Sequence, residues 1–107
     1  MARIDAATVD RSRRALKALA RRASVAAAFV FGSRCDGRAD SWSDIDIAVF
    51  VRGAEDWDMV TRARIFAQVQ KEAGDEVELH FFPARALKHA DPGSFAAYVM
   101  KSGIAVN

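Results

Sequence analysis

A strict alternation of β-branched residues with other residues runs along residues 44–52 and is the clearest pattern in the chain. Because successive side chains of a strand point to opposite faces, this period of two predicts a β-strand with one buried face. Asp44 and Asp46 fall together on the other face, followed by Ala48 and Phe50. The buried side is formed by the branched residues Ile45, Ile47, Val49 and Val51.

Two further apolar runs predict strands, and three- and four-residue spacings predict helices between them. Asp5 is a suitable N-cap for the first helix, and Gly74 is a natural end for the second. The expected result is an α/β fold in which a small sheet is backed by helices. The strands are expected at Val25–Phe31, Asp44–Arg52 and Glu76–Phe82, and the helices at Ala6–Ala23, Glu55–Gly74, Pro83–Ala90 and Ser94–Ser102.

The periodicity also predicts which side of each long helix faces the core. Each predicted stripe consists of apolar residues three, four or seven positions apart. For the first helix the stripe is Val9, Leu16, Leu19, Ala20 and Ala23, and for the second it is Met59, Ala63, Phe66, Val69 and Ala73.

Length and composition favour one domain over residues 1–107, because 107 residues with 51% apolar content can support one modest core. The sequence shows no apolar run of about 18 residues and no signal segment at its start, so a soluble, cytoplasmic protein without a membrane partner is expected. The only cysteine, Cys35, cannot form an internal disulfide.

The net charge of +2 is too small to argue for direct nucleic-acid binding. Positive charge is nevertheless concentrated on the first predicted helix, where Arg13, Lys17 and Arg21 lie one turn apart. This basic ridge is either the solvated face of an amphipathic helix or a docking strip for an acidic protein or RNA.

Candidate chemistry lies where the first strand ends and the second begins. Gly32 allows close backbone approach to a ligand, and Ser33 offers a hydroxyl and an N–H to phosphate oxygens. The Cα atoms of Asp44 and Asp46 are expected about 6.6 Å apart, two strand steps, so that both carboxylates can bind one Mg²⁺ or bridge a pair. Positive charge from Arg34 and Arg38 would stabilise charge that develops on transferring phosphates.

The segment GSRCDGRADSWSDIDIAVF closely resembles the signature of the minimal nucleotidyltransferases, small members of the DNA polymerase β-like superfamily. Two residues depart from the usual signature, Cys35 in place of alanine and Asp36 in place of arginine. The matching residues are Gly32, Ser33, Arg34, Gly37, Ser43, Asp44, Ile45 and Asp46.

The resemblance implies a nucleotidyltransferase fold, with a mixed β-sheet and three carboxylates gathered on one open face. Glu78 matches the third position, usually an aspartate, which helps a metal ion to deprotonate the attacking hydroxyl. Asp44, Asp46 and Glu78 would then be both the metal ligands and the catalytic residues, with two Mg²⁺ ions, or Mn²⁺, as cofactor. Nucleotide binding would fall to Gly32, Ser33, Arg34, Arg38 and Ser43.

The activity that the resemblance implies is transfer of AMP from ATP to a hydroxyl. Minimal nucleotidyltransferases commonly pair with a helical HEPN ribonuclease toxin, act as its antitoxin and can adenylylate one of its tyrosines, so a hetero-oligomer with such a toxin is expected. Acceptor recognition is expected to come from that partner, because no acceptor-binding domain follows residue 82.

Two alternatives remain open at this stage. One is an inactive antitoxin that covers the toxin surface, with Asp36 and Glu78 as signs of lost catalysis. The other is a small-molecule nucleotidyltransferase of the aminoglycoside-modifying type. His80 shares the predicted face of Glu78 and is either a neighbour of the metal or a hydrogen-bonded structural histidine.

Overall fold

The computed structural model describes residues 4–32 and 44–106. Ser33, Arg34, Arg38 and Ser43, which the sequence assigns to nucleotide binding, lie outside the described residues. The elements in chain order are α1 (Ala6–Ala20), β1 (Ser24–Phe31), β2 (Ile45–Arg52), the 3-10 turn η2 (Ala54–Asp56), α2 (Met59–Ala73), β3 (Val77–Pro83), α3 (Ala86–His89), α4 (Phe95–Ser102) and β4 (Ile104–Ala105).

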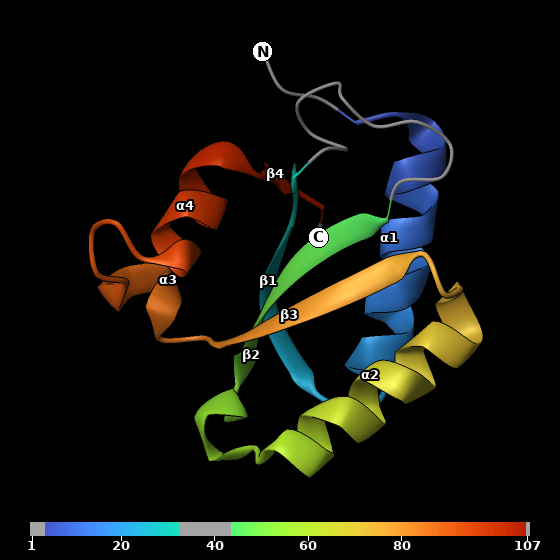
Figure 1. The fold of residues 1–107 in the computed structure, drawn as a ribbon, viewed down its shortest axis with the longest axis horizontal. Helices are drawn as coiled ribbons and strands as arrows, with labels where there is room; N and C mark the ends of the chain where they lie inside the picture. Colours follow the sequence, from blue (N-terminus) through green and yellow to red (C-terminus); the bar gives the residue numbers. More distant parts are fainter. Residues whose placement is uncertain (1–3, 33–43, 107) are drawn as a thin grey trace.

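The strands form one mixed sheet in the order β3-β2-β1-β4 (Figure 1). β1 is antiparallel to both β2 and β4, whereas β2 and β3 run parallel. A parallel pair needs a crossover connection, and η2 with α2 supplies it. The predicted fold class, a small mixed α/β sheet backed by helices, is therefore confirmed.

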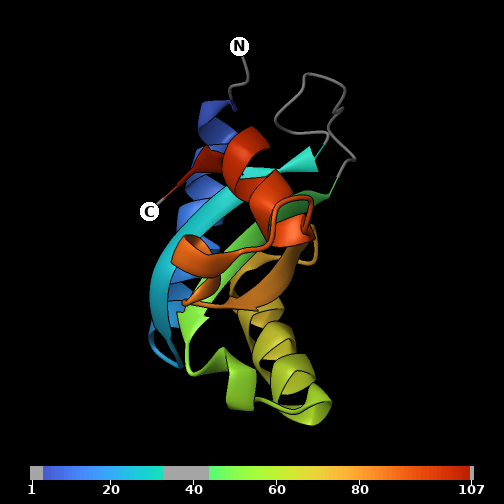
Figure 2. The ribbon, with the colours of Figure 1, turned by 90° about the vertical axis from the view of Figure 1, so that its left-hand side faces the viewer.

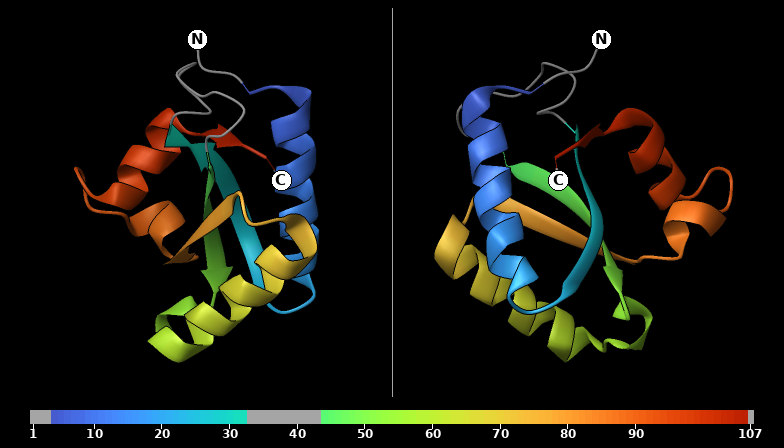
Figure 3. Two further views of the ribbon diagram at one scale, coloured as in Figure 1. Left: turned by 45° about the vertical axis from the view of Figure 1, so that its right-hand side comes forward. Right: turned by 180° about the vertical axis from the view of Figure 1, so that it is seen from behind.

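The first face of the sheet packs against α1 and α2, and both panels of Figure 3 show these two helices together on one side of the strands. The alternation predicted for β2 is confirmed, since its four branched residues are completely buried here. Val77 and Leu79 of β3 join the same cluster. The cluster from β2 comprises Ile45, Ile47, Val49 and Val51.

The second face is covered by α3 and α4, which lie in front of the strands in Figure 2. Ala48 and Phe50 of β2 pack here with Ala96 and Val99 of α4. The Phe50 ring stacks on Phe82, with centroids 5.2 Å apart. Along β2 the apolar cluster of this face begins at Ala48, so Asp46, two residues earlier, is not a member of it, although Phe31, the partner of Asp46 on β1, is.

Both long helices differ from their predicted bounds. α1 ends at Ala20 rather than Ala23, because the N–H groups of Arg22 and Ala23 both bond to the Leu19 carbonyl and close its last turn. The segment predicted as one helix from Glu55 is interrupted, since Asp58 accepts a hydrogen bond from the Thr61 N–H and starts α2 afresh.

The inner stripes of the two helices were only partly right. In α2 the buried residues are Ile65, Val69 and Ala73, of which the last two were predicted. The buried stripe is rotated around the helix from the predicted one, and Met59 is 82% exposed. Arg62 takes the corresponding position in the first turn and donates to the carbonyls of Ala54 and Phe81. The buried residues of α1 are Thr8, Ser12, Ala15, Leu16, Ala18 and Leu19, whereas Ala20 is exposed.

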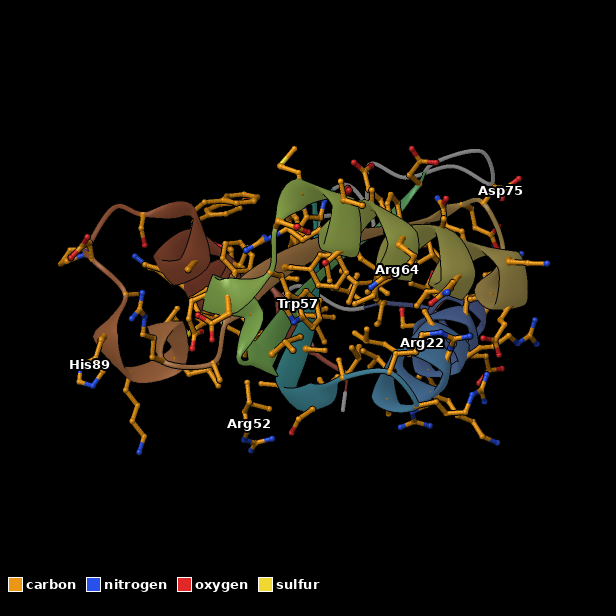
Figure 4. All side chains as sticks on the ribbon, turned by 90° about the horizontal axis from the view of Figure 1, so that it is seen from below. Arg22, Arg52, Trp57, Arg64, Asp75 and His89 are labelled. Carbon is orange, nitrogen blue, oxygen red and sulfur yellow. The ribbon has the colours of Figure 1, made fainter. Side chains whose placement is uncertain are left out.

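Polar contacts join α1 to α2 at the carboxyl end of α1. Arg21 and Arg22 both pair with Glu72, and Arg22 also donates to Gln68. Arg22 is labelled in Figure 4. One member of the predicted basic ridge, Arg21, therefore has an intramolecular partner, whereas Arg13 and Lys17 are simply exposed. Exposed pairs of this kind contribute little to stability individually.

Candidate metal and nucleotide site

The parallel pairing of β2 and β3 places Asp46 directly opposite Glu78. Neighbouring strands lie about 4.8 Å apart, so two carboxylates in register can approach one cation from adjacent strands. Asp44 is exposed and precedes the first residue of β2.

His80 completes a group of three with these two carboxylates. One ligand atom from each of Asp46, Glu78 and His80 lies within 4.8 Å of the other two. The His80 Nε2 is 3.3 Å from the Asp46 Oδ1, within hydrogen-bonding distance. Among the described residues, Asp44 is not a member of this group.

His80 is held by aromatic rings as well as by Asp46. Its ring makes an edge-to-face contact with Phe31, with centroids 5.0 Å apart, and lies 6.1 Å from Phe95. Sequence reasoning left two interpretations of His80 open, a metal neighbour or a hydrogen-bonded histidine, and the geometry is compatible with both. The signal was the alternation of β3, which puts residues 78 and 80 on one face.

Gly32 directly follows β1 and lies beside Asp46. Its φ is +81°, a region that side-chain-bearing residues rarely adopt. A Cβ at this position would lie 3.0 Å from the Asp46 Oδ2, tighter than ordinary contact. The backbone angle therefore favours glycine, and any side chain at this position would press on the Asp46 carboxylate, which lies against the turn.

The three groups are open to solvent to different degrees. Glu78 is exposed, whereas the side chains of Asp46 and His80 retain 27% and 29% of their exposure. A ligand can thus reach the carboxylates, while partial burial holds two of the three donors in place. Two carboxylates and one imidazole fit a divalent cation, since carboxylate oxygens suit Mg²⁺ and Mn²⁺ and imidazole nitrogen is acceptable to Mn²⁺ and Zn²⁺.

The sequence model of the family described as Polymerase beta, Nucleotidyltransferase matches residues 14–106. The match covers most of the chain, including all four strands and the candidate site. The chain belongs to this family. A search of curated proteins found no match.

Membership of the family supports a general nucleotidyltransferase activity with a nucleoside triphosphate as substrate. The resemblance to the polymerase β-like superfamily that was noted from the sequence is thereby confirmed at this level. Within residues 4–32 and 44–106, no helix has the length and apolar character needed to cross a bilayer.

Proposed function

We propose that the chain is a metal-dependent nucleotidyltransferase that transfers AMP from ATP to a protein hydroxyl. The observation that carries this proposal is the register of β2 and β3, which sets Asp46 opposite Glu78 beside the glycine turn at Gly32. The same geometry gathers acidic ligands and a phosphate-approachable backbone within one small region. We also propose that residues 1–107 form one minimal nucleotidyltransferase domain.

Each residue has a distinct role in the proposed reaction. Asp46 and Glu78, with His80 beside them and Asp44 at the entry to β2, would hold Mg²⁺ or Mn²⁺. The bound metal would supply positive charge that lowers the pKa of the acceptor hydroxyl and neutralises the departing pyrophosphate. Gly32 and Ser33 would bind the β and γ phosphates through backbone N–H groups and the serine hydroxyl.

The chemical step exchanges one phosphorus–oxygen bond for another. The acceptor oxygen bonds to the α-phosphorus of ATP, the bond from that phosphorus to pyrophosphate breaks, and the hydroxyl proton passes to Glu78. Glu78 is suited to this because it is exposed and can meet an acceptor presented from outside the sheet. Arg34, Arg38 and Ser43 would contact the nucleotide from the segment between β1 and β2.

The proposed acceptor is a tyrosine of a HEPN ribonuclease toxin, which makes the chain the antitoxin of that toxin. Support for this finer assignment is the likeness of residues 32–50 to the minimal nucleotidyltransferase signature. Association with the toxin would form a hetero-oligomer, and modification of its tyrosine would inactivate it.

The test is to incubate the chain with ATP, Mg²⁺ and the co-expressed partner and to follow the intact mass of the partner. We expect a mass gain of whole AMP units with the wild-type chain and with Asp10→Asn, an exposed control on α1. Asp46→Asn should abolish both the gain and protection against the toxin.

The other hypotheses predict different results. A purely steric antitoxin would protect without any mass gain, and Asp46→Asn would protect equally well. A small-molecule nucleotidyltransferase would leave the partner unmodified and raise resistance to an added aminoglycoside. Either result would overturn the proposed acceptor.

A further inference from the structure

Two aromatic rings of α4 remain half exposed beside the candidate site. Phe95 and Tyr98 keep 48% and 50% of their exposure. Their rings stack on one another, with centroids 6.1 Å apart and planes only 10° from parallel. Among the described residues, the other exposed large apolar side chains are Met59 and Val60, at the start of α2.

Ring contacts connect this aromatic pair to the metal-binding group. Phe95 meets Phe31 edge to face with centroids 5.3 Å apart, and its ring lies 6.1 Å from that of His80. His80 in turn lies 3.3 Å from Asp46. Phe95 therefore lies next to the candidate metal ligand His80, and Tyr98 lies on the other side of Phe95 in this chain of ring contacts.

The pair is also connected to the backbone turn at Gly32, which is proposed to bind phosphate and is called the phosphate turn below. Phe31 directly precedes Gly32, whose backbone lies against Asp46. A triphosphate bound at Gly32 would thus lie next to Phe31, whose ring contacts Phe95. Figure 2 shows α4 lying across the strands near the end of β1, which is where β1 enters this turn.

Phe95 is fixed by its surroundings, so the pair forms a preorganised surface. Ser94 caps α4 by accepting from the Ala97 N–H, and Phe95 contacts Phe82 as well as Phe31 and His80. Tyr98 extends this anchored ring outward on the next turn of the helix. The exposed aromatic surface would offer its face to a planar ligand without first reorganising.

We propose that Phe95 and Tyr98 form a stacking platform for the nucleobase of the bound triphosphate. This inference rests on the proposed function, since it assumes that a nucleotide binds with its phosphates at Gly32. A nucleobase fits better than an apolar protein segment because the exposed surface consists of two nearly parallel rings beside the phosphate turn. Stacking accepts any base, so the platform predicts binding that favours the larger purines without strict choice between adenine and guanine.

The test compares ATP with inorganic tripolyphosphate, which carries the phosphates but no base. Dissociation constants would be measured by calorimetry with Mg²⁺ for the wild-type chain, Tyr98→Ala, Tyr98→Phe and Val60→Ala. We expect Tyr98→Ala to bind ATP at least about fivefold more weakly and tripolyphosphate equally well. Tyr98→Phe keeps the ring and Val60→Ala removes an exposed apolar side chain elsewhere, so both should bind like wild type.

A second readout reports on the ring itself. Tyr98 is the only tyrosine of the chain, so incorporation of 3-fluorotyrosine gives one fluorine resonance. ATP and GTP should shift this resonance, whereas tripolyphosphate should not. Phe95→Leu keeps an apolar side chain against Phe31 and should reduce the ATP-induced shift.

The outcomes separate this inference from the proposed function. If wild type binds ATP and transfers AMP but Tyr98→Ala binds ATP unchanged, or loses ATP and tripolyphosphate equally, only the platform is overturned. A resonance that responds to the acceptor protein and not to ATP would assign the surface to the acceptor and would also overturn it. Failure of the wild-type chain to bind any triphosphate would overturn both.

Discussion

The two faces of the sheet are built from the same strands and both bury apolar side chains, but only one of them carries the candidate metal group. The face toward α1 and α2 is a continuous cluster of buried branched residues, to which β2 contributes four that are 0% exposed. The face toward α3 and α4 also has a buried apolar cluster, around Phe31, Ala48 and Phe50, but this face carries in addition the polar group of Asp46, Glu78 and His80.

Because side chains alternate between the faces, one strand can supply core residues and candidate site residues at neighbouring positions. Asp46 and Ile47 are adjacent in the chain, but one belongs to the candidate metal group and the other is completely buried in the core. Substitutions at neighbouring positions should therefore have different consequences. The site face tolerates solvent and charge because the other face supplies most of the apolar burial.

Glu78→Gln tests the chemical face and should give the largest effect. If Glu78 binds the metal and accepts the proton as proposed, its removal should lower the rate of AMP transfer by about 10²–10⁴-fold. Because Glu78 is exposed, the free energy of unfolding should stay close to wild type. Transfer rates would be compared with those of Glu55→Gln, an exposed control on η2, and an unchanged rate would remove Glu78 from the mechanism.

Ile47→Ala tests the buried face. Ile47 is 0% exposed, so its truncation leaves a cavity and should lower the free energy of unfolding by about 2–5 kcal/mol. Ile47→Val should lower it by only about 0.5–1.5 kcal/mol. Denaturant unfolding measures both changes. The rate of transfer per folded molecule should remain that of wild type. A loss of this rate would contradict the assignment of stability to one face and of chemistry to the other.

Gly32→Ala and Gly53→Ala separate backbone strain from damage to the site. Both glycines have positive φ, +81° and +84°, so alanine should destabilise each variant by about 1–2 kcal/mol. Only at Gly32 would the new Cβ crowd the Asp46 carboxylate, since nothing lies within 4 Å at Gly53. Metal affinity and transfer should fall in Gly32→Ala alone; equal behaviour of the two variants would show that the turn does not act through Asp46.

Asp58, the exposed N-cap of α2, gives the smallest predicted effect. The hydrogen bond from the Thr61 backbone N–H lowers the pKa of Asp58 in the folded chain. A lowered folded-state pKa means that the stabilisation is present above the ordinary carboxyl pKa and is lost as pH falls through the folded value. Asp58→Asn should remove this part of the acid-induced loss of stability, which unfolding experiments at neutral and acidic pH would reveal. An unchanged pH dependence would contradict the assignment.

Local patterns were sufficient to predict the two faces of β2 and β3, because alternation depends only on the backbone period. The same patterns could not show that Asp46 pairs with Glu78, since register and parallel direction are set by the crossover through α2. The two-residue strand β4, Ile104–Ala105, was missed because it is too short to show a period.

Errors in the helices arose where polar residues replaced apolar ones at inner positions. Arg62 faces the core in the first turn of α2 by bonding two carbonyls, which shifted the true stripe away from Met59. The helix predicted from Glu55 is interrupted at Asp58, whose side chain accepts from the Thr61 N–H and caps a new helix. Asp58 is a recognisable N-cap residue in the sequence, but the apolar spacing on both sides of it favoured one continuous helix. The alternation of β3 places His80 on the same face as Glu78, but its contacts with Asp46 and Phe31 depend on the tertiary structure and could not be predicted from the sequence.

The proposed chemistry requires Asp46, Glu78 and His80 to bind a divalent cation together. Titration of the chain with Mn²⁺, with free Mn²⁺ followed by electron paramagnetic resonance, measures this binding. We predict that Asp46→Asn and His80→Ala each weaken Mn²⁺ binding by about tenfold or more, whereas Asp10→Asn binds like wild type. Equal Mn²⁺ affinity in wild type and Asp46→Asn would contradict the account.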